Sequence, residues 1–158
     1  MNLFILDKDL QQSIQALDDK RIIKMVLETA QILCTVLSNE GLDVPYRPTH
    51  KNHPVTKWVG SSKQNLIYTW NYFNYILDEY QHRFSKRHKC ADVQSYLHPY
   101  ISQVITTSDR ATSFENCSSF KNEEDVIQAY RKTMVNKWAS DKRSPNWTKR
   151  NKPVWGIE

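Results

Sequence analysis

A stripe of polar residues on an otherwise apolar helix carries the side chains best suited to chemistry. Residues 19–38 are predicted to form one helix, because apolar residues cover most of its surface at helical spacing. The polar side chains fall within one arc of roughly 100°. They are Lys20, Arg21, Lys24, Glu28, Gln31 and Thr35. A charged strip on a buried helix must find partners or line a cleft, since an isolated buried charge is costly.

Glu28 is the candidate catalytic group on this stripe. A carboxylate whose ionisation is set by its surroundings can act as a general acid or as an electrostatic group. We predict that Lys20, Arg21 and Lys24 hold phosphate groups beside it, with Gln31 on the same strip. The alternative is an ordinary ion pair, because Lys24 and Glu28 are four residues apart, where such a pair contributes only about 0.2–0.5 kcal/mol.

The loop before the next predicted helix is a second polar cluster, Thr49-His50-Lys51-Asn52-His53-Pro54. A helix N-terminus attracts anions, so His50, Lys51, Asn52 and His53 are candidate ligands for a phosphate. The two histidines could instead ligate a metal, but no cysteine or carboxylate cluster completes a ligand set. We therefore expect no metal and no cofactor. A third interpretation is a capping loop with structural histidines.

The segment from Glu79 to His88 is also rich in cations. Arg83, Lys86 and His88 are candidates for facing a substrate cleft, although cations are favourable at a helix C-terminus without any function. Glu79 and His82 form one ExxH pair, whereas a di-iron bundle needs two such pairs and two further glutamates. We therefore reject a di-iron site.

The C-terminal tail concentrates the positive charge of the chain. The net charge is +5, but residues 131–152 alone carry +7, from eight basic residues and one acid, Asp141, so the rest carries −2. A basic surface attracts polyanions such as nucleic acid, and aromatic faces stack on bases. The candidates for nucleic-acid contact here are Arg131, Lys137, Trp147 and Arg150. The alternatives are a solvated tail, or tryptophans that anchor the tail on the core.

The elements that must position these residues are helices. In the first half of the chain, Asp9 is a predicted N-cap, Gly41 a predicted stop and Pro54 a first-turn residue. The predicted helices there are 9–17, 19–38 and 54–86, the last broken at 60–62.

In the second half the helix signals are weaker. We predict one or two turns within 92–97, ended by Pro99, then a loop at 102–121. A last helix is predicted to begin at the cap Asn122, with acids in its first turn. The tail, residues 139–158, is expected to be irregular.

Composition excludes several classes of protein. A chain of 158 residues with only three Gly suits one compact all-α domain, residues 1–158, and lacks a Gly-rich nucleotide loop. No run reaches about 18 apolar residues, so we expect no membrane span, and no signal peptide is recognised. Cys34, Cys90 and Cys117 lack CxxC spacing and are expected to be reduced, which favours a cytoplasmic protein.

Four features occur together in one known family. They are the helix start at 17–23 (Leu-Asp-Asp-Lys-Arg-Ile-Ile), then Glu28, then His53 before an aromatic helix, and Glu79 near Arg83. Together they resemble the phage endonuclease V-like superfamily of pyrimidine-dimer DNA glycosylases. The sequence is most similar to small uncharacterised phage and bacterial members, which share the Met-Asn-Leu-Phe start and the Thr-His-Lys-Asn-His-Pro loop.

The resemblance implies an all-α, phage-type protein that binds damaged DNA, in the host cytoplasm if phage-encoded. Family members attack the sugar C1′ atom with the N-terminal α-amine and form a Schiff base, assisted by a glutamate that aligns with Glu28. Arginines on the same helix contact phosphates, and the nearest positions are Lys20, Arg21 and Lys24. The histidine before the second long helix aligns with His53.

The nucleophile implied by the resemblance lies at the start of the chain. An α-amine is partly neutral near pH 7 and can act as a nucleophile. Family members expose a small second residue after removal of the initiator Met. Here the size of Asn2 disfavours that removal, so the attacking amine is expected to be that of Met1.

Three hypotheses about function follow. The first is a DNA N-glycosylase that excises damaged or modified bases, with AP-lyase activity through a Schiff base, and with Glu28, Met1 and Asn2 as catalytic residues. The second is a non-catalytic nucleic-acid-binding protein that uses the basic tail. The third is a module for a nucleotide or phosphate ligand, held by the stripe and the loop from His50 to His53.

Overall fold

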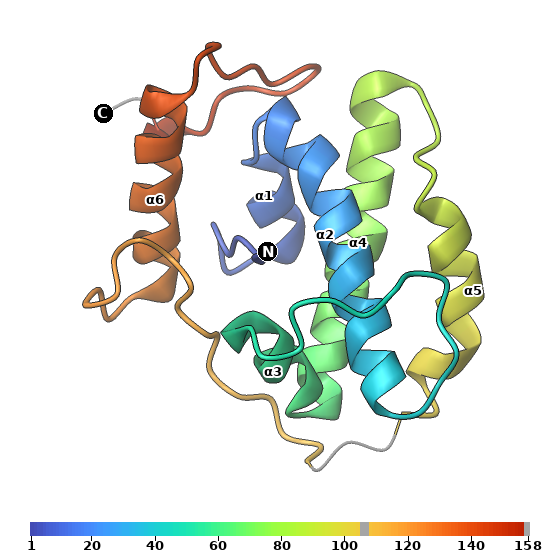
Figure 1. Cartoon of the computed structure of the whole chain (residues 1–158). Coiled ribbons are helices and arrows are strands. Elements are labelled where there is room, and N and C mark those ends of the chain that lie inside the picture. The colour runs from blue at the N-terminus through green and yellow to red at the C-terminus, as the bar shows by residue number, and fades with distance from the viewer. Residues whose placement is uncertain (105–107, 157–158) are drawn as a thin grey trace.

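The computed structural model describes residues 1–104 and 108–156, and this part of the chain is helical without a strand. Its helices are α1 (Leu10–Gln15), α2 (Asp19–Asn39), α3 (Pro54–Gly60), α4 (Lys63–Phe84), α5 (Ala91–Ile101) and α6 (Val126–Ser140), followed by the 3-10 turn η1 (Val154–Gly156) (Figure 1). The predicted all-α fold is confirmed.

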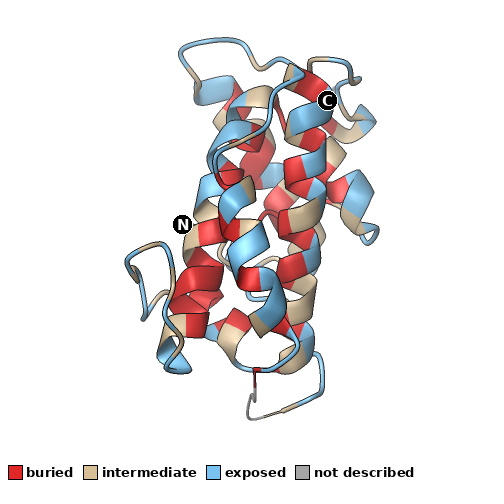
Figure 2. Cartoon of the chain, turned by 90° about the vertical axis from the view of Figure 1, so that its right-hand side faces the viewer, coloured by how far each residue is buried: buried red, intermediate tan, exposed pale blue. Residues whose placement is uncertain are grey.

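The two longest helices, α2 and α4, lie side by side at the centre of the molecule, with α3 and α5 packed against both (Figure 1). Both central helices contribute fully buried side chains, among them Ile22, Leu33, Phe73 and Ile76. Burial of one such side chain contributes about 1.5–3 kcal/mol. Figure 2 shows buried and exposed residues alternating along the helices, so this packing fixes which side of α2 carries the polar stripe.

The ends of α1 and α2 follow the predicted signals. Asp9 caps α1 by accepting a hydrogen bond from the Gln12 backbone N–H at 2.8 Å. Past the end of α2, Gly41 has a φ of +84°, in the left-handed region. The N–H of Leu42 then reaches the carbonyl of Leu37, which is the outer hydrogen bond of a Schellman motif.

α2 is also long and apolar enough to cross a membrane, by length and composition alone, with a mean hydropathy of 1.3. However, 61% of that stretch is buried inside the protein. Burial against other helices accounts for most of its apolar surface, as expected for a core helix, although Ile23 and Leu27 remain 49% and 43% exposed.

The predicted break between α3 and α4 is confirmed. Pro54 is the first residue of α3, where its missing N–H costs nothing. α4 has its own cap, because the Ser62 hydroxyl accepts a hydrogen bond from the Asn65 N–H at 3.1 Å. The chain turns at residues 61–62, between the end of α3 and the Ser62 cap of α4, and α3 packs against both central helices.

The predicted stop at Pro99 is wrong, since α5 continues to Ile101. Pro99 lacks the N–H that would bond the carbonyl four residues earlier. Its side of the helix is exposed, so water can satisfy that carbonyl. On the other side, Leu97 and Ile101 are buried, and this packing outweighs the lost hydrogen bond.

The predicted start of the last helix is also wrong, because α6 begins at Val126 rather than at Asn122. Asp125 is the actual cap, and its carboxylate accepts hydrogen bonds from the N–H groups of Ile127 and Gln128. Several residues in this stretch can cap a helix, and the sequence does not rank them. The loop predicted at 102–121 carries no helix in its described residues, 102–104 and 108–121.

The N-terminal arm, residues 2–6, is extended and lies between α2 and α6 (Figure 1). Its side chains Leu3 to Leu6 are buried, and the ring of Phe4 packs edge-on against Tyr130 of α6 at 5.8 Å. The tail then returns to the first turn of α2, where the carbonyl of Asn146 accepts from the Asp19 N–H at 2.8 Å. The arm and the tail thereby hold α6 opposite the stripe.

Candidate active site

The start of the chain meets Glu28 on the polar stripe. The Met1 α-amine lies 3.8 Å from Glu28 Oε2, and the backbone N–H of Asn2 donates to the same oxygen at 3.0 Å. On the other carboxylate oxygen, Lys24 Nζ lies at 3.3 Å. The Glu28 side chain is only 14% exposed. A primary amine and a carboxylate are therefore held together in a partly dry environment.

The side chain of Asn2 holds the arm in this position. Its Oδ1 atom accepts hydrogen bonds from the Tyr130 hydroxyl and from the Leu3 N–H, both at 2.9 Å, and its Nδ2 atom donates to the Cys117 carbonyl at 3.3 Å. Asn2 thus ties the first residues to α6 and to the loop before it. Asn2 is predicted from sequence as a catalytic residue, and in the structure its side chain positions the arm.

A cavity of about 400 Å³ opens beside this pair, between the arm, α2 and α6. The predicted site residues that line it are Met1, Asn2, Lys20, Arg21, Lys24, Glu28 and Lys137. Its other walls are Phe4, Met25, Cys117, Ser119, Thr133, Ser140 and Asp141. Cations, hydroxyls and apolar surface therefore converge on the amine and the carboxylate.

A larger cavity of about 720 Å³ lies between α1 and the tail, lined by Asp7, Gln12, Gln15, Ala16 and the residues from Lys149 to Trp155. Arg150, the most strongly engaged cation there, is bound to Glu79. We place the candidate site in the smaller cavity, because it contains the amine and the carboxylate.

Two of the cations at the cavity are already paired with one acid. Lys20 Nζ lies 2.6 Å from Asp141 Oδ1, and Arg21 forms an ion pair with the other carboxylate oxygen of Asp141. Hydrogen bonds from Arg21 and then from Lys20 lower the pKa of Asp141 to about 2. Arg21 is also paired with Asp18 at 3.3 Å, and Asp18 in turn accepts from the Trp138 indole at 2.8 Å.

His53 caps α3 close to the chain start. Its Nδ1 atom accepts a hydrogen bond from the Val55 N–H at 3.2 Å, so the proton of the neutral ring is on Nε2. Partial burial, followed by the positive charges of the chain terminus and of His50, lowers the pKa of His53. His53 is therefore a neutral hydrogen-bond donor near pH 7. His50, Lys51 and Asn52 are exposed in the preceding loop, and Gln31 is half-buried on α2.

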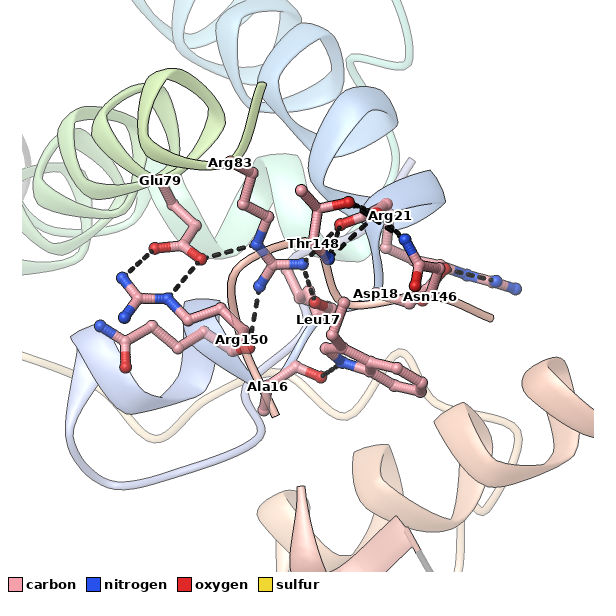
Figure 3. A network of polar contacts seen from close by, with 12 residues as sticks. Ala16, Leu17, Asp18, Arg21, Glu79, Arg83, Asn146, Thr148 and Arg150 are labelled. Atoms are coloured by element: carbon pink, nitrogen blue, oxygen red, sulfur yellow. Dashed lines mark hydrogen bonds and ion pairs between the residues drawn. The ribbon is translucent and has the colours of Figure 1, made fainter. Parts of the chain in front are cut away.

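Arg83 and Arg150 have structural partners in place of the predicted nucleic-acid contacts. Figure 3 shows both side chains around the carboxylate of Glu79. Arg83 is 1% exposed and donates to Glu79 at 2.6 Å, to the carbonyls of Leu17 and Gln15, and to Asp19. A phosphate cannot reach this guanidinium in the folded protein.

Arg150 closes the same network from the tail. It donates to both oxygens of Glu79, at 3.0 and 2.8 Å. Burial raises the pKa of Glu79, but the hydrogen bonds from Arg150 and Arg83 outweigh it, and the net pKa is lowered. The network attaches the tail to α1, α2 and α4 (Figure 3).

Trp147 and Arg131 also have partners within the protein. Trp147 is 9% exposed, donates its indole N–H to the Ala16 carbonyl at 3.0 Å and packs edge-on against Trp138, so its ring is not accessible for stacking on a base. Arg131 binds the Leu6 carbonyl and Asp7 and lies over the ring of Trp155.

Beyond α4, Lys86 is exposed and His88 is half-buried. The ring of His88 packs edge-on against Tyr80 at 4.7 Å and accepts from the Cys90 N–H at 3.0 Å. His88 therefore stabilises the turn between α4 and α5.

Comparison with known proteins identifies a family that the chain matches. The family model described as pyrimidine dimer DNA glycosylase matches residues 1–92, more than half of the chain. The matched part includes the arm, the stripe and His53, but not α6 or the tail. No curated protein and no solved structure gives a significant match.

Proposed function

The chain belongs to the pyrimidine dimer DNA glycosylase family, and on that premise we propose that it excises a damaged or modified base from DNA at the cavity that contains Glu28. The observation that carries the proposal is the 3.8 Å separation between the terminal α-amine and the Glu28 carboxylate. An amine nucleophile beside a carboxylate is the pair that glycosidic bond cleavage through a Schiff base requires.

The proposed reaction begins with attack by the amine nitrogen on C1′ of the damaged nucleotide. The bond from C1′ to the base breaks, and the base leaves with the electron pair and takes a proton from water. Glu28 accepts the proton that the amine loses and then gives it to the sugar ring oxygen as the ring opens to the Schiff base. Water hydrolyses this adduct, or a base (Glu28 or water) removes a proton from C2′ while the 3′ phosphate leaves with the electron pair of its C3′–O bond, which is the AP-lyase step.

Glu28 is suited to both proton transfers because it is mostly shielded from solvent and because each of its carboxylate oxygens has a partner that fixes its orientation. The Asn2 N–H and Lys24 bind it from opposite sides. Its negative charge also stabilises the positive charge that develops on the Schiff base. His53 lies near enough to the chain terminus and Glu28 for their charges to act on its pKa, and we assign its neutral ring the role of hydrogen-bond donor to a sugar or phosphate oxygen of the bound DNA.

The identity of the attacking amine depends on whether Met1 is retained. With Met1 present, its amine is the nucleophile, 3.8 Å from Glu28. If Met1 is removed, the nitrogen of Asn2, 3.0 Å from the same oxygen, becomes the terminal amine with little movement of the arm. Both states support the reaction, and intact mass spectrometry of the purified protein distinguishes them.

Phosphate contacts are assigned to the cations around the cavity: Lys20, Arg21, Lys24 and Lys137. Extrusion of a nucleotide is needed to bring C1′ to the amine, and damaged bases cost less to extrude than paired ones. Exposed Lys142 and Arg143 extend the basic surface beyond α6. Together these cations attract the DNA backbone by a sequence-independent force.

The decisive experiment is borohydride trapping on a DNA duplex that contains an abasic site or a pyrimidine dimer. We expect a covalent adduct with the wild-type protein and a loss of about 10²–10⁴-fold in rate for Glu28→Gln. Glu40→Gln, an exposed charge removal at the other end of α2, is the matched control and should trap like wild type. Absence of any adduct, together with DNA binding that Glu28→Gln leaves unchanged, would favour a non-catalytic nucleic-acid-binding protein.

A further inference from the structure

Asp141 is the one acid within residues 131–152, and it lies where the basic surface meets the candidate site. It follows the last residue of α6 and adopts an extended backbone, with a ψ of 137°. Its side chain lines the cavity that contains Glu28 and is 11% exposed. Its carboxylate is therefore part of the cavity wall and is mostly, but not fully, shielded from solvent.

The two carboxylate oxygens of Asp141 bind two cations of α2. Oδ1 lies 2.6 Å from Lys20 Nζ, and Oδ2 is paired with Arg21. A carboxylate and a phosphodiester each present a single negative charge on two oxygen acceptors, and both suit Lys and Arg donors. Asp141 thus occupies the position in which these two cations would hold a DNA phosphate.

The second acid beside Arg21 has a different environment. Asp18 is 1% exposed, pairs with Arg21 at 3.3 Å and is fixed by the Trp138 indole at 2.8 Å. Arg21 therefore keeps a buried structural partner if the ion pair with Asp141 breaks. Lys20, whose side chain is 64% exposed, is free to turn to a new anion.

Resting on the DNA-binding function proposed above, we propose that Asp141 is an internal phosphate mimic that occupies Lys20 and Arg21 until a backbone phosphate replaces it. DNA entry is an exchange of one anion for another on the same two cations. The exchange weakens non-specific binding. An undamaged duplex must break the ion pairs of Asp141, and it forms few new contacts in return. It also keeps the cations in place while the site is empty.

The exchange predicts that a mutation in a DNA-binding site increases the affinity for DNA, whereas most such mutations decrease it. Asp141→Asn removes the competing charge, so we expect affinity for DNA to rise roughly tenfold at low salt. Because one competing negative charge is removed and one phosphate is bound, the plot of log affinity against log salt concentration should steepen by about one unit, at about 0.9 per phosphate neutralised.

The test uses fluorescence anisotropy with a duplex that carries an uncleavable tetrahydrofuran abasic-site analogue. Asp92→Asn is the matched control, because Asp92 also pairs with an arginine, at 2.8 Å, but on the exposed surface of α5. We expect tighter binding and a steeper salt dependence for Asp141→Asn only. Lys20→Ala should cost more affinity in the Asp141→Asn background than in the wild-type background.

If Asp141→Asn binds DNA no more tightly than Asp92→Asn, the exchange is refuted, and Asp141 only orients the cations. A second measurement needs no variant at this position: the carboxyl carbon resonance of Asp141 in the wild-type protein should shift on saturation with DNA, and an unchanged resonance also refutes the exchange. Failure of the wild-type protein to bind the duplex at all would overturn the proposed function itself.

Discussion

Replacement of Arg83 by Gln removes the centre of the network that joins the tail to the helices. The Arg83 guanidinium binds Glu79, Asp19 and two carbonyls at the end of α1, from a position that is 1% exposed. Removing one partner of a buried ion pair costs about 3–5 kcal/mol, and each carbonyl left without a partner adds about 1–3 kcal/mol. Arg150 still neutralises Glu79, so we expect a loss at the lower end of the combined range, about 5 kcal/mol.

The matched comparison lies four residues along the chain. Arg87 forms an ion pair with Asp92 in which both side chains are more than half exposed, and such surface pairs contribute about 0–1 kcal/mol. Urea denaturation followed by circular dichroism should therefore show Arg87→Gln close to wild type. At roughly 2–4 °C per kcal/mol for a chain of this size, Arg83→Gln should melt on the order of 10 °C lower.

The same pair of variants also tests whether Arg83 stabilises the fold or contacts nucleic acid. If Arg83→Gln unfolds with wild-type stability and weakens DNA binding, then the side chain faces the nucleic acid, as expected from sequence, and the network is wrong. If it lowers stability while the folded fraction binds DNA normally, the structural role is supported. A stability change no larger than that of Arg87→Gln would refute the magnitude argued from burial.

Three further predictions concern the arm, the network and the loop. Tyr130→Phe removes the hydroxyl donor to Asn2 and should cost about 1 kcal/mol while slowing borohydride trapping; unchanged trapping would show that the arm needs no such support. The pKa of Glu79 is lowered in the folded state, so its contribution to stability is present above about pH 4.3, the ordinary value of a Glu carboxyl, and is lost as the pH falls. The free energy of unfolding measured in urea should therefore depend less on pH below about pH 4.3 in Glu79→Gln than in the wild-type protein. An equal pH dependence in the two proteins would contradict this prediction. His53→Asn keeps a side-chain acceptor for the α3 cap but not the ring, so it should preserve stability and lower the trapping rate; an equal loss of both would assign His53 to capping alone.

The helices that carry the site could be predicted because their signals are local. The apolar spacing of α2, the glycine at its end and the proline at the start of α3 each act within a few residues. The misplaced ends were those where nearby residues compete, as Asn122 and Asp125 do for the cap of α6. The sequence predicts that the helix ends at Pro99, but burial of the opposite face of α5, a tertiary effect, decides that the helix continues.

Within the site, sequence reasoning identified the side chains on one helix but not their partners across the fold. Four residues of the stripe, Lys20, Arg21, Lys24 and Glu28, line one cavity together with the start of the chain, whereas Gln31 and Thr35 lie outside it. Arg83 and Trp147 look the same in a sequence whether they face solvent or the core. A local signal was available for Arg83, since Glu79 lies four residues before it in the same helix. A sequence signal was also available for the cavity wall formed by Asp141, because Asp141 is the one acid among the eight basic residues of 131–152.

The cavity is therefore lined by two parts of the chain, of which only the first lies within the match to the family model. The arm, α2 and His53 lie within residues 1–92, which match the family model, and they supply the amine and the carboxylate. The opposite wall, with Lys137, Thr133 and Asp141, belongs to α6 and the residue after it, outside that match. α6 is held across the cavity by Tyr130 at one end and by the ion pairs of Asp141 at the other. Under the proposed function, the matched part of the chain supplies the reacting groups, and the unmatched part supplies the facing wall with its basic surface.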